Sequence, residues 1–446
     1  MEEPYRIDPI PDASRPGTLS RGISVIVPVM NGGEALAELF RKIRSQKKVE
    51  EVEIIVLDSG STDDSAAIAE SFGCRVIGIP REEFNHGATR NVGAGQAKGD
   101  YLVFTVQDAV PVSDYWLYAM ASPFRWAPDL GAVSARQFTR PEADLFSLWT
   151  NDAVNAMIGL ERDSVYGLSP SFDFSGWNRL DPLTKRRASF VDDVSSCIPK
   201  SAHGEAPFRS LANAEDIDLG IRMLEKGKRL GYLTSTGVFH WHDRGPDYFL
   251  KRSYIGTKAN VHVLKNPLPR FFEERGIDRQ TFLSSVAGLL DLVALAAPEP
   301  EAVDPEPMKT AVAFGSSFRR HFDSSPEEVS AALKGTGGGC RERLEAACSG
   351  VFGNARLLPE ERHRFRKNFL VPHFLREVGN FTGFLARSGL SGKGRAGEFG
   401  TCIQKIFASV VGEAAGAFYL ESETRGRLTE DLERTDRLLA KGVCRS

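Results

Sequence analysis

The stretch from Phe84 to Asp108 constrains the fold more than any other part of the chain. It opens with a glycine-punctuated loop and a short helix start, and it closes with a near-continuous apolar run, Tyr101 to Val106. This run is too short for a helix and rich in β-forming residues, so it predicts a buried strand. Such strands usually lie in a parallel sheet that is covered on both faces. Gln107 and Asp108 follow at the strand's carboxyl end, where open α/β sheets bind their ligands.

Apolar runs and helical periods alternate on both sides of this strand, which predicts an α/β fold with a mostly parallel sheet. The expected strands are Ile23–Pro28, Glu53–Leu57, Arg75–Ile79, Gly131–Arg136, Phe190–Ile198 and Tyr232–His240. The expected helices are Glu34–Ser45, a helix capped by Thr62 or Asp63 and ending at Phe72, Tyr115–Phe124, Glu215–Lys226 and Tyr248–Leu264. Loop-like sequence runs through Pro170–Trp177.

Four segments are predicted along the chain, whose 446 residues suffice for two or more domains. Residues 1–20 are expected to be a flexible lead-in, and 21–265 to form the α/β domain. Residues 266–307 are expected to hold a connecting helix and an acidic, proline-rich linker, PEPEAVDPEP. Residues 308–446 show helical periodicity, clearest from Ile403 to Val411, and predict an α-helical region.

The composition excludes several classes of protein. Basic and acidic residues nearly balance, 56 against 59, so no nucleic-acid partner is expected. The longest apolar stretch, Val286 to Ala297, is too short to span a bilayer, and the polar N-terminus lacks the features of a signal peptide. The six scattered cysteines are expected to be reduced thiols. These features predict a cytoplasmic protein without a transmembrane segment.

Asp58-Ser59-Gly60-Ser61 follows a predicted strand and precedes a predicted helix. A carboxylate at that place can accept the N3–H of a uracil or thymine ring, while the loop amides face anionic groups. An Asx-type turn that only ends the strand is equally compatible with the sequence.

His86, Arg90 and Asn91 stand beside Gly87 in an expected loop, which suits either a phosphate or base contact or a solvated surface. Asp108 is of a type that binds hard cations such as magnesium or manganese, although a structural role is as compatible.

Glu215 and Asp216 open a predicted helix, where carboxylates favour the positive end of the dipole; on sequence alone this structural reading is favoured. His240 and His242 would face the same side of a strand and suggest a metal or phosphate site. The basic residues that follow suit a diphosphate site or a solvated face equally: Arg244, Lys251 and Arg252.

Taken together, six segments resemble the family-2 glycosyltransferases with the GT-A fold, in their bacterial rhamnosyltransferase branch. The segments are SVIVPVMNGG, EIIVLDSGSTDDS, EEFNHGATRN, YLVFTVQDAVP, NAEDIDLGIRMLEKG and VFHWHDRG, and they cover roughly residues 22–265. The resemblance implies that a set of residues binds the nucleotide sugar: Pro28, Asn31, Asp58, Ser61, Arg90, Gln107 and Asp108. It also implies that Asp108 and His240 bind Mg²⁺ or Mn²⁺, that Asp216 is the catalytic base, and that Glu215 supports the base or the acceptor.

One departure from the family pattern concerns the metal. The first aspartate of the family's D-x-D motif is Val106 here, although related rhamnosyltransferases also have Q-D-A at this place. A sugar-nucleotide-binding scaffold without turnover therefore stays open. A nucleotidyltransferase is disfavoured, because VPVMNGGEA after the first strand has no lysine or arginine.

The expected activity is inverting transfer of L-rhamnose from dTDP-L-rhamnose to a hydroxyl of a bacterial surface glycan or lipid-linked glycan. A UDP-hexose is the alternative donor. Peripheral contact with the inner face of the membrane and homo-oligomerisation stay open. The C-terminal helices are expected to dock near the acceptor side or to mediate self-association, with an independent helical domain as the alternative.

Overall fold

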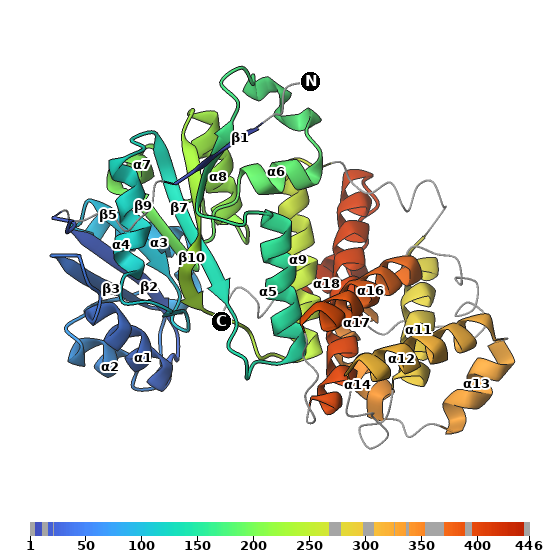
Figure 1. Ribbon diagram of the computed structural model, residues 1–446. Coiled ribbons are helices and arrows are strands. Elements are labelled where there is room, and N and C mark those ends of the chain that lie inside the picture. Colours follow the sequence, from blue (N-terminus) through green and yellow to red (C-terminus); the bar gives the residue numbers. More distant parts are fainter. Residues whose placement is uncertain are drawn as a thin grey trace.

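A computed structural model describes residues 5–10, 17–20, 22–266, 278–297, 307–324, 326–335, 339–352, 370–388 and 395–440. A mixed sheet with its covering helices occupies one side of the molecule, and a bundle of helices occupies the other (Figure 1). Two helices, α5 (Leu145–Ile158) and α9 (Pro246–Leu264), lie between these two parts.

The strands of the described residues form one sheet in the order β1-β8-β10-β7-β9-β5-β2-β3-β4, and β6 pairs with β10. Their bounds are β1 (Tyr5–Pro9), β2 (Ile23–Val29), β3 (Val52–Asp58), β4 (Arg75–Gly78), β5 (Tyr101–Thr105), β6 (Val110–Pro111), β7 (Leu130–Phe138), β8 (Ser164–Leu168), β9 (Ser195–Pro199) and β10 (Arg229–Phe239). The β4-β3-β2-β5 part is parallel, as expected from the alternation of strands and helices. β9 runs antiparallel to β5 and β7, so the sheet as a whole is mixed.

Helices cover both faces of the sheet because successive side chains along a strand point to opposite faces. Val25 and Val27 of β2 pack on one face with α1 (Gly33–Arg44) and α4 (Trp116–Ala121). Ile26 packs on the other face, which is covered by α3 (His86–Gln96), α7 (Lys200–Glu205) and α8 (Glu215–Glu225). The remaining elements on this side of the molecule are α2 (Ser65–Ser71), α6 (Pro182–Ala188) and the 3₁₀ turns Arg81–Glu83, Ser122–Arg125 and Phe174–Arg179.

A further hydrophobic core holds the C-terminal helices together and includes α5 and α9. Its other helices are α11 (Arg279–Ala296), α12 (Pro307–Asp323), α14 (Gly339–Ala347), α15 (Ser349–Phe352), α16 (Leu370–Ser388), α17 (Ala396–Thr424) and α18 (Glu430–Ala440), and α13 (Pro326–Gly335) contacts α11. The apolar spacing predicted from Ile403 to Val411 lies on α17 and is buried, which confirms the helical C-terminal region.

Helix α17 lies unusually close to α9 because two glycines face it. A Cβ atom at Gly412 would collide with the carbonyl oxygen of Leu250, and one at Gly416 would lie 2.7 Å from that of Tyr254. Lys405 of α17 is buried and its Nζ lies 3.3 Å from Oδ1 of Asp144, the residue that caps α5. Together these contacts fix α17 against both α5 and α9.

The amino-terminal segment differs from the expected flexible lead-in over residues 1–20. Tyr5–Pro9 forms β1, which pairs antiparallel with β8. Leu19 is 1% exposed, and its backbone N–H donates to the carbonyl oxygen of Lys48. The expectation is wrong for these two segments, because β1 pairs with the backbone of β8 and Leu19 is buried in the core.

The loop expected around His86, Arg90 and Asn91 is also wrong, since all three residues lie on α3. The side chain of Asn85 caps this helix by accepting from the backbone N–H of Ala88 at 3.0 Å. Gly87 is needed not for a turn but for close packing, because a Cβ there would collide with the carbonyl oxygen of Arg209.

Smaller differences lie elsewhere in the first half of the chain. The residue before α2 is Asp64 rather than Thr62 or Asp63, and the expected strand Phe190–Ile198 begins only at Ser195. The loop-like segment Pro170–Trp177 contains the start of the 3₁₀ turn Phe174–Arg179, and α5 and β8, which precede it, are not among the predicted elements. His240 lies just beyond the end of β10 rather than on it.

The expected connecting helix within 266–307 is α11, which is buried in the helical core. The proline-rich linker falls outside the described residues except for Pro307, which begins α12. Within the described ranges, no helix combines the length and apolar character that crossing a membrane requires. Cys74, Cys197, Cys340, Cys348 and Cys402 are buried and form no disulfide within the described residues, and Cys444 lies outside them.

Candidate active site

A cavity of about 760 Å³ opens at the carboxyl ends of β2 and β5. Strand ends, α3 and α8 supply one part of its lining, and we call this part the sheet side. Helices α5, α9, α16 and α17 supply the other part, which we call the helical side. Its size is that of pockets that enclose small ligands.

Asp108, His240 and His242 form a first cluster on the sheet side, with one potential ligand atom of each lying within 4.8 Å of the others. Nε2 of His240 is 3.6 Å from Oδ1 of Asp108, and the two imidazole rings are 4.7 Å apart between centroids. Burial and the nearby charge of Arg252 lower the pKa of His242 to about 2, so its ring is neutral. A carboxylate and two neutral imidazoles are suitable ligands for a divalent cation.

Gln137 of β7 determines which ring nitrogen of His240 carries the proton. The side-chain Nε2 of Gln137 donates to Oδ2 of Asp192 at 2.6 Å, and therefore its Oε1 is left to accept. Nδ1 of His240 lies 2.8 Å from this Oε1 and donates to it. The lone pair of His240 is consequently on Nε2, on the side of Asp108.

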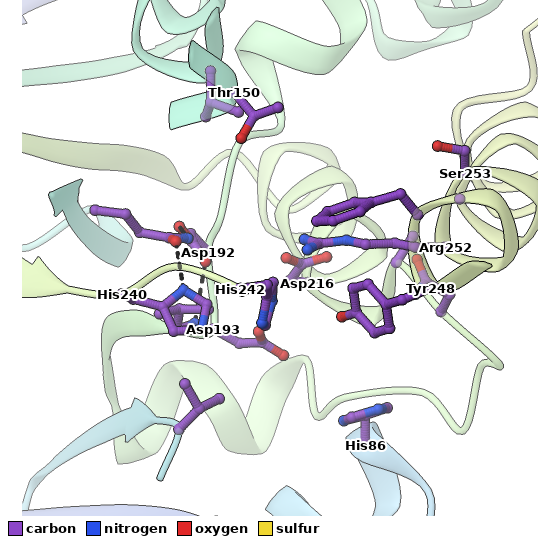
Figure 2. Close-up of a pocket in the computed structure, with 18 of the residues that line it drawn as sticks. His86, Thr150, Asp192, Asp193, Asp216, His240, His242, Tyr248, Arg252 and Ser253 are labelled. Atoms are coloured by element: carbon purple, nitrogen blue, oxygen red, sulfur yellow. Dashed lines mark hydrogen bonds between the residues drawn. The ribbon is translucent and has the colours of Figure 1, made fainter. Parts of the chain in front are cut away.

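Asp192, Asp193 and Asp216 form a second cluster, in which one carboxylate oxygen of each lies within 4.8 Å of the others (Figure 2). Burial, and after it the charge of Asp193, raises the pKa of Asp216 to about 7. Burial also raises the pKa of Asp192 to about 6, against the hydrogen bond from Gln137. Crowded carboxylates that share a desolvated site hold protons more tightly than isolated ones.

Arg90 is the buried cation of this cluster and is only 2% exposed. Its Nη1 lies 2.8 Å from Oδ2 of Asp193 and 2.9 Å from Oε1 of Glu215. Burial and the charge of Asp193 still raise the pKa of Glu215 well above its ordinary value. The guanidinium that the sequence suggested for a base or diphosphate contact is thus directed at two carboxylates.

The backbone before α8 brings Glu215 and Asp216 to the cavity. Ala214 has a φ of +64°, a left-handed conformation that residues with a Cβ rarely adopt. No side chain caps the helix at this position, and Oδ1 of Asp216 accepts from the backbone N–H of Ile217 at 2.7 Å. Figure 2 shows Asp216 between the histidines and Arg252.

Asn31, Asp58 and Ser61 form one network that joins the ends of β2 and β3. Ser61 donates its hydroxyl to Oδ1 of Asp58 and accepts from the backbone N–H of Asn31 at 2.9 Å. The side-chain oxygen of Asn31 accepts from the backbone N–H of Thr62 at 2.8 Å. These three residues lie beside the cavity, whereas Pro28 and Ser59 line it.

Gln107 lines the cavity, but its amide group is used within the protein. Its Oε1 accepts from the backbone N–H of Met30 at 2.8 Å, and its Nε2 donates to the carbonyl oxygen of the same residue at 3.2 Å. The side chain therefore ties the end of β5 to the turn after β2, and the carboxylate of Asp108 is left facing the cavity.

The structure adds residues that sequence reasoning missed, chiefly Asp192, Asp193 and Gln137. The two aspartates stand between Val191 and Val194, and a pair of carboxylates inside an apolar run is a signal that could have been noticed. Gln137 gave no comparable signal, because its importance comes from its position between His240 and Asp192.

Comparisons with known proteins show which sequences are similar to this chain. Residues 24–180 match the model of the family described as "Glycosyl transferase family 2". The O-antigen chain rhamnosyltransferase WbaN of Salmonella anatum is 27% identical over 271 residues, which cover 59% of this chain and 79% of that protein. The O-antigen chain rhamnosyltransferase RfbN of Salmonella typhimurium is 23% identical over 272 residues, with the same two coverages.

Among solved structures, the mannosyltransferase PcManGT from Pyrobaculum calidifontis has a TM-score of 0.42 and 15% identity, covering 87% of this chain and 91% of its own. The family model and the two rhamnosyltransferases, together with the α/β sheet and the cavity at its strand ends, support a family-2 glycosyltransferase of GT-A fold that is similar to the rhamnosyltransferase-like branch.

Proposed function

We propose that this glycosyltransferase moves L-rhamnose from dTDP-L-rhamnose to a hydroxyl group of a bacterial surface glycan, free or lipid-linked, with inversion at the anomeric carbon. One observation carries the proposal. A cluster suited to a divalent cation and a cluster of carboxylates with raised pKa values face the same cavity. The two Salmonella relatives, both described as O-antigen chain rhamnosyltransferases, support the choice of donor and acceptor.

The nucleoside is assigned to the edge where β2 and β3 end. Pro28 and Ser59 line the cavity there, beside the network of Asn31, Asp58 and Ser61. Oδ1 of Asp58 is engaged by Ser61, whereas its Oδ2 has no hydrogen bond to the described residues and can accept the N3–H of thymine. This assignment favours dTDP or UDP donors over purine nucleotides.

The diphosphate is assigned to the region between the histidines and α9. Arg252 lines the cavity next to His242 and makes no ion pair within the described part of the chain. Its guanidinium can hold phosphate oxygens in a bidentate manner. Arg90 is assigned a positioning role instead, because it already has two carboxylate partners.

Asp108 and His240 are assigned to the metal, Mg²⁺ or Mn²⁺, and His242 joins them. The donor set fits such a cation, because one carboxylate and the free Nε2 of His240 converge with a second neutral imidazole. His242 thus makes up for Val106, which stands where the family motif has its first aspartate. A cation bound there would supply charge that stabilises the departing diphosphate.

Asp216 is assigned as the general base. Its carboxylate takes the proton from the acceptor hydroxyl while the acceptor oxygen bonds to the anomeric carbon. The bond between that carbon and the diphosphate oxygen breaks, and dTDP leaves with the electron pair. A base with a pKa of about 7 is matched to this task near neutral pH. Asp193 and Glu215, both held by Arg90, support the position of Asp216.

The test combines donor binding with turnover in the full chain. We expect dTDP- or UDP-sugars to raise the melting temperature more than GDP-sugars, since a ligand that binds only the folded state stabilises it. Asp216→Asn should keep this protection and lose transfer of rhamnose to a methyl glycoside by about 10²–10⁴-fold. Greater protection by a GDP-sugar would overturn the donor assignment, and wild-type transfer by Asp216→Asn would overturn the base.

A further inference from the structure

The C-terminal helices extend the cavity on the side away from the strand ends. We infer that α16 and α17 form a wall of the acceptor site, and that this wall binds the hydroxyl groups of an uncharged saccharide. The inference rests on the proposed function, because it takes the cavity as the place where donor and acceptor meet.

Helix α17 presents one stripe of residues to the cavity: Ile406, Ser409, Val410 and Glu413. Their spacing of three and four residues places them on one face of the helix. Glu377 of α16 lines the cavity beside them. This face is therefore directed at the cavity, whereas much of the rest of α17 is buried in the helical core.

A second stripe faces the cavity from α9, at Ser253, Thr257 and Asn260. These residues are also spaced by four and three positions and carry two hydroxyl groups and an amide. Oδ1 of Asn260 is buried and has no hydrogen-bond partner in the described structure. A buried polar atom without a partner is costly, and a hydroxyl group of a ligand would satisfy it.

The charge of the C-terminal wall selects between classes of acceptor. Glu377 and Glu413 line the cavity, and no lysine or arginine of the described parts of α16 and α17 lines it with them. Nε2 of His373 lies 3.2 Å from Glu413 and 3.8 Å from Glu377, and the side chain of Glu413 is still 43% exposed. Carboxylates repel phosphate and carboxylate groups but accept hydrogen bonds from hydroxyls.

Aromatic rings complete the chemistry of a sugar site. Tyr248 and Trp149 line the same side of the cavity. A pyranose has apolar C–H faces and a rim of hydroxyl groups, so it matches rings that are flanked by carboxylates, hydroxyls and an amide. Since the family match ends at residue 180, this wall lies outside the matched segment.

The experiment uses methyl glycosides of mannose, galactose, rhamnose and N-acetylglucosamine as probes for the full chain with dTDP and diamagnetic Mg²⁺. Saturation-transfer NMR reports binding of each glycoside and of dTDP separately. We expect at least one glycoside to bind. Glu413→Gln should weaken the binding of that glycoside about tenfold, because a charged hydrogen-bond acceptor is lost. Glu423→Gln changes the same charge on the exposed surface of α17 and should leave glycoside binding unchanged.

A second variant, Ser409→Trp, should block glycoside binding by filling the space beside Glu413, while dTDP binding stays at the wild-type level. The inference is overturned if no glycoside binds to the wild type, or if both variants bind glycosides as the wild type does. If dTDP fails to bind while glycosides bind to the wild type and more weakly to Glu413→Gln, the proposed donor is wrong, but the inference about α16 and α17 is supported.

Discussion

The sheet side and the helical side of the cavity are built in opposite ways. On the sheet side the charged groups hold one another: Arg90 binds Asp193 and Glu215, and Gln137 links His240 to Asp192. On the helical side His373 contacts Glu377 and Glu413, whereas Oδ1 of Asn260, which lines the cavity, has no partner in the described structure. The difference indicates that one side is preorganised for chemistry, whereas the other is completed by what it binds.

Removing Arg90 should have the largest effect, because the sheet side depends on it for charge balance. Arg90→Met leaves Asp193 and Glu215 buried without a cation, and loss of one partner of a buried pair costs about 3–5 kcal/mol. Urea unfolding measures this loss. Arg209→Met removes a largely exposed arginine from Asp218, which keeps Arg222 as a partner, and should cost no more than about 1 kcal/mol.

Adding Glu215→Gln to Arg90→Met should restore part of the lost stability, because one of the two buried carboxylates without a cation is removed. If Arg90→Met unfolded at the same urea concentration as the wild type, the sheet side would not depend on internal pairing. The contrast between the two sides would then be lost.

Gln137 should have an intermediate effect, seen in metal binding. In Gln137→Leu, Nδ1 of His240 loses the acceptor that fixes its tautomer, and outer-shell changes of this kind typically weaken metal binding about 10–100-fold. Titration of Mn²⁺ in the presence of dTDP, followed by electron paramagnetic resonance, measures this directly. Gln46→Leu removes a glutamine that bonds to the backbone far from the cavity, and it should leave Mn²⁺ affinity unchanged. Equal affinities in the two variants would remove Gln137 from this role.

The pH dependence of stability should show the smallest effect. Asp216 and Asp192 have pKa values raised to about 7 and 6, above the ordinary value of 3.8. The folded chain therefore holds protons that the unfolded chain has released. The contribution of these two carboxyl groups to the free energy of unfolding is full below pH 4 and is lost as the pH rises through 6 and 7. Between pH 5 and 8, the melting temperature of Asp216→Asn without metal should fall less than that of the wild type. Parallel curves would contradict the raised pKa of Asp216.

The sequence predicted the parts of the site that depend on local pattern. Asp108 could be placed because a buried strand ends just before it, and carboxyl ends of parallel strands meet at one edge. Arg90 was misplaced because Gly87 suggested a loop, whereas this glycine serves a close contact with Arg209. Asp192 and Asp193 fall inside the predicted strand Phe190–Ile198, whereas β9 begins only at Ser195 and runs antiparallel to its neighbours, so the two aspartates precede it.

Docking of the C-terminal helices near the acceptor side is one of the expectations from the sequence, but the residues that line the helical side could not have been identified from it. The periodicity of α17 identified a helix, but the same pattern fits a helix in any core. What brings Glu413 to the cavity is packing against α9, between residues far apart in the chain. Such contacts depend on the fit of two surfaces, and no single segment records that fit.

The two glycines of α17 have a consequence for how this enzyme can diverge. Gly412 and Gly416 set the spacing of α17 from α9, and neither of them lines the cavity. A side chain at either position would push the helices apart and widen the space between the stripes that carry Glu413 and Asn260. In the acceptor site that we propose, substitutions at these two positions would therefore change the range of accepted saccharides and leave every residue of the cavity lining in place.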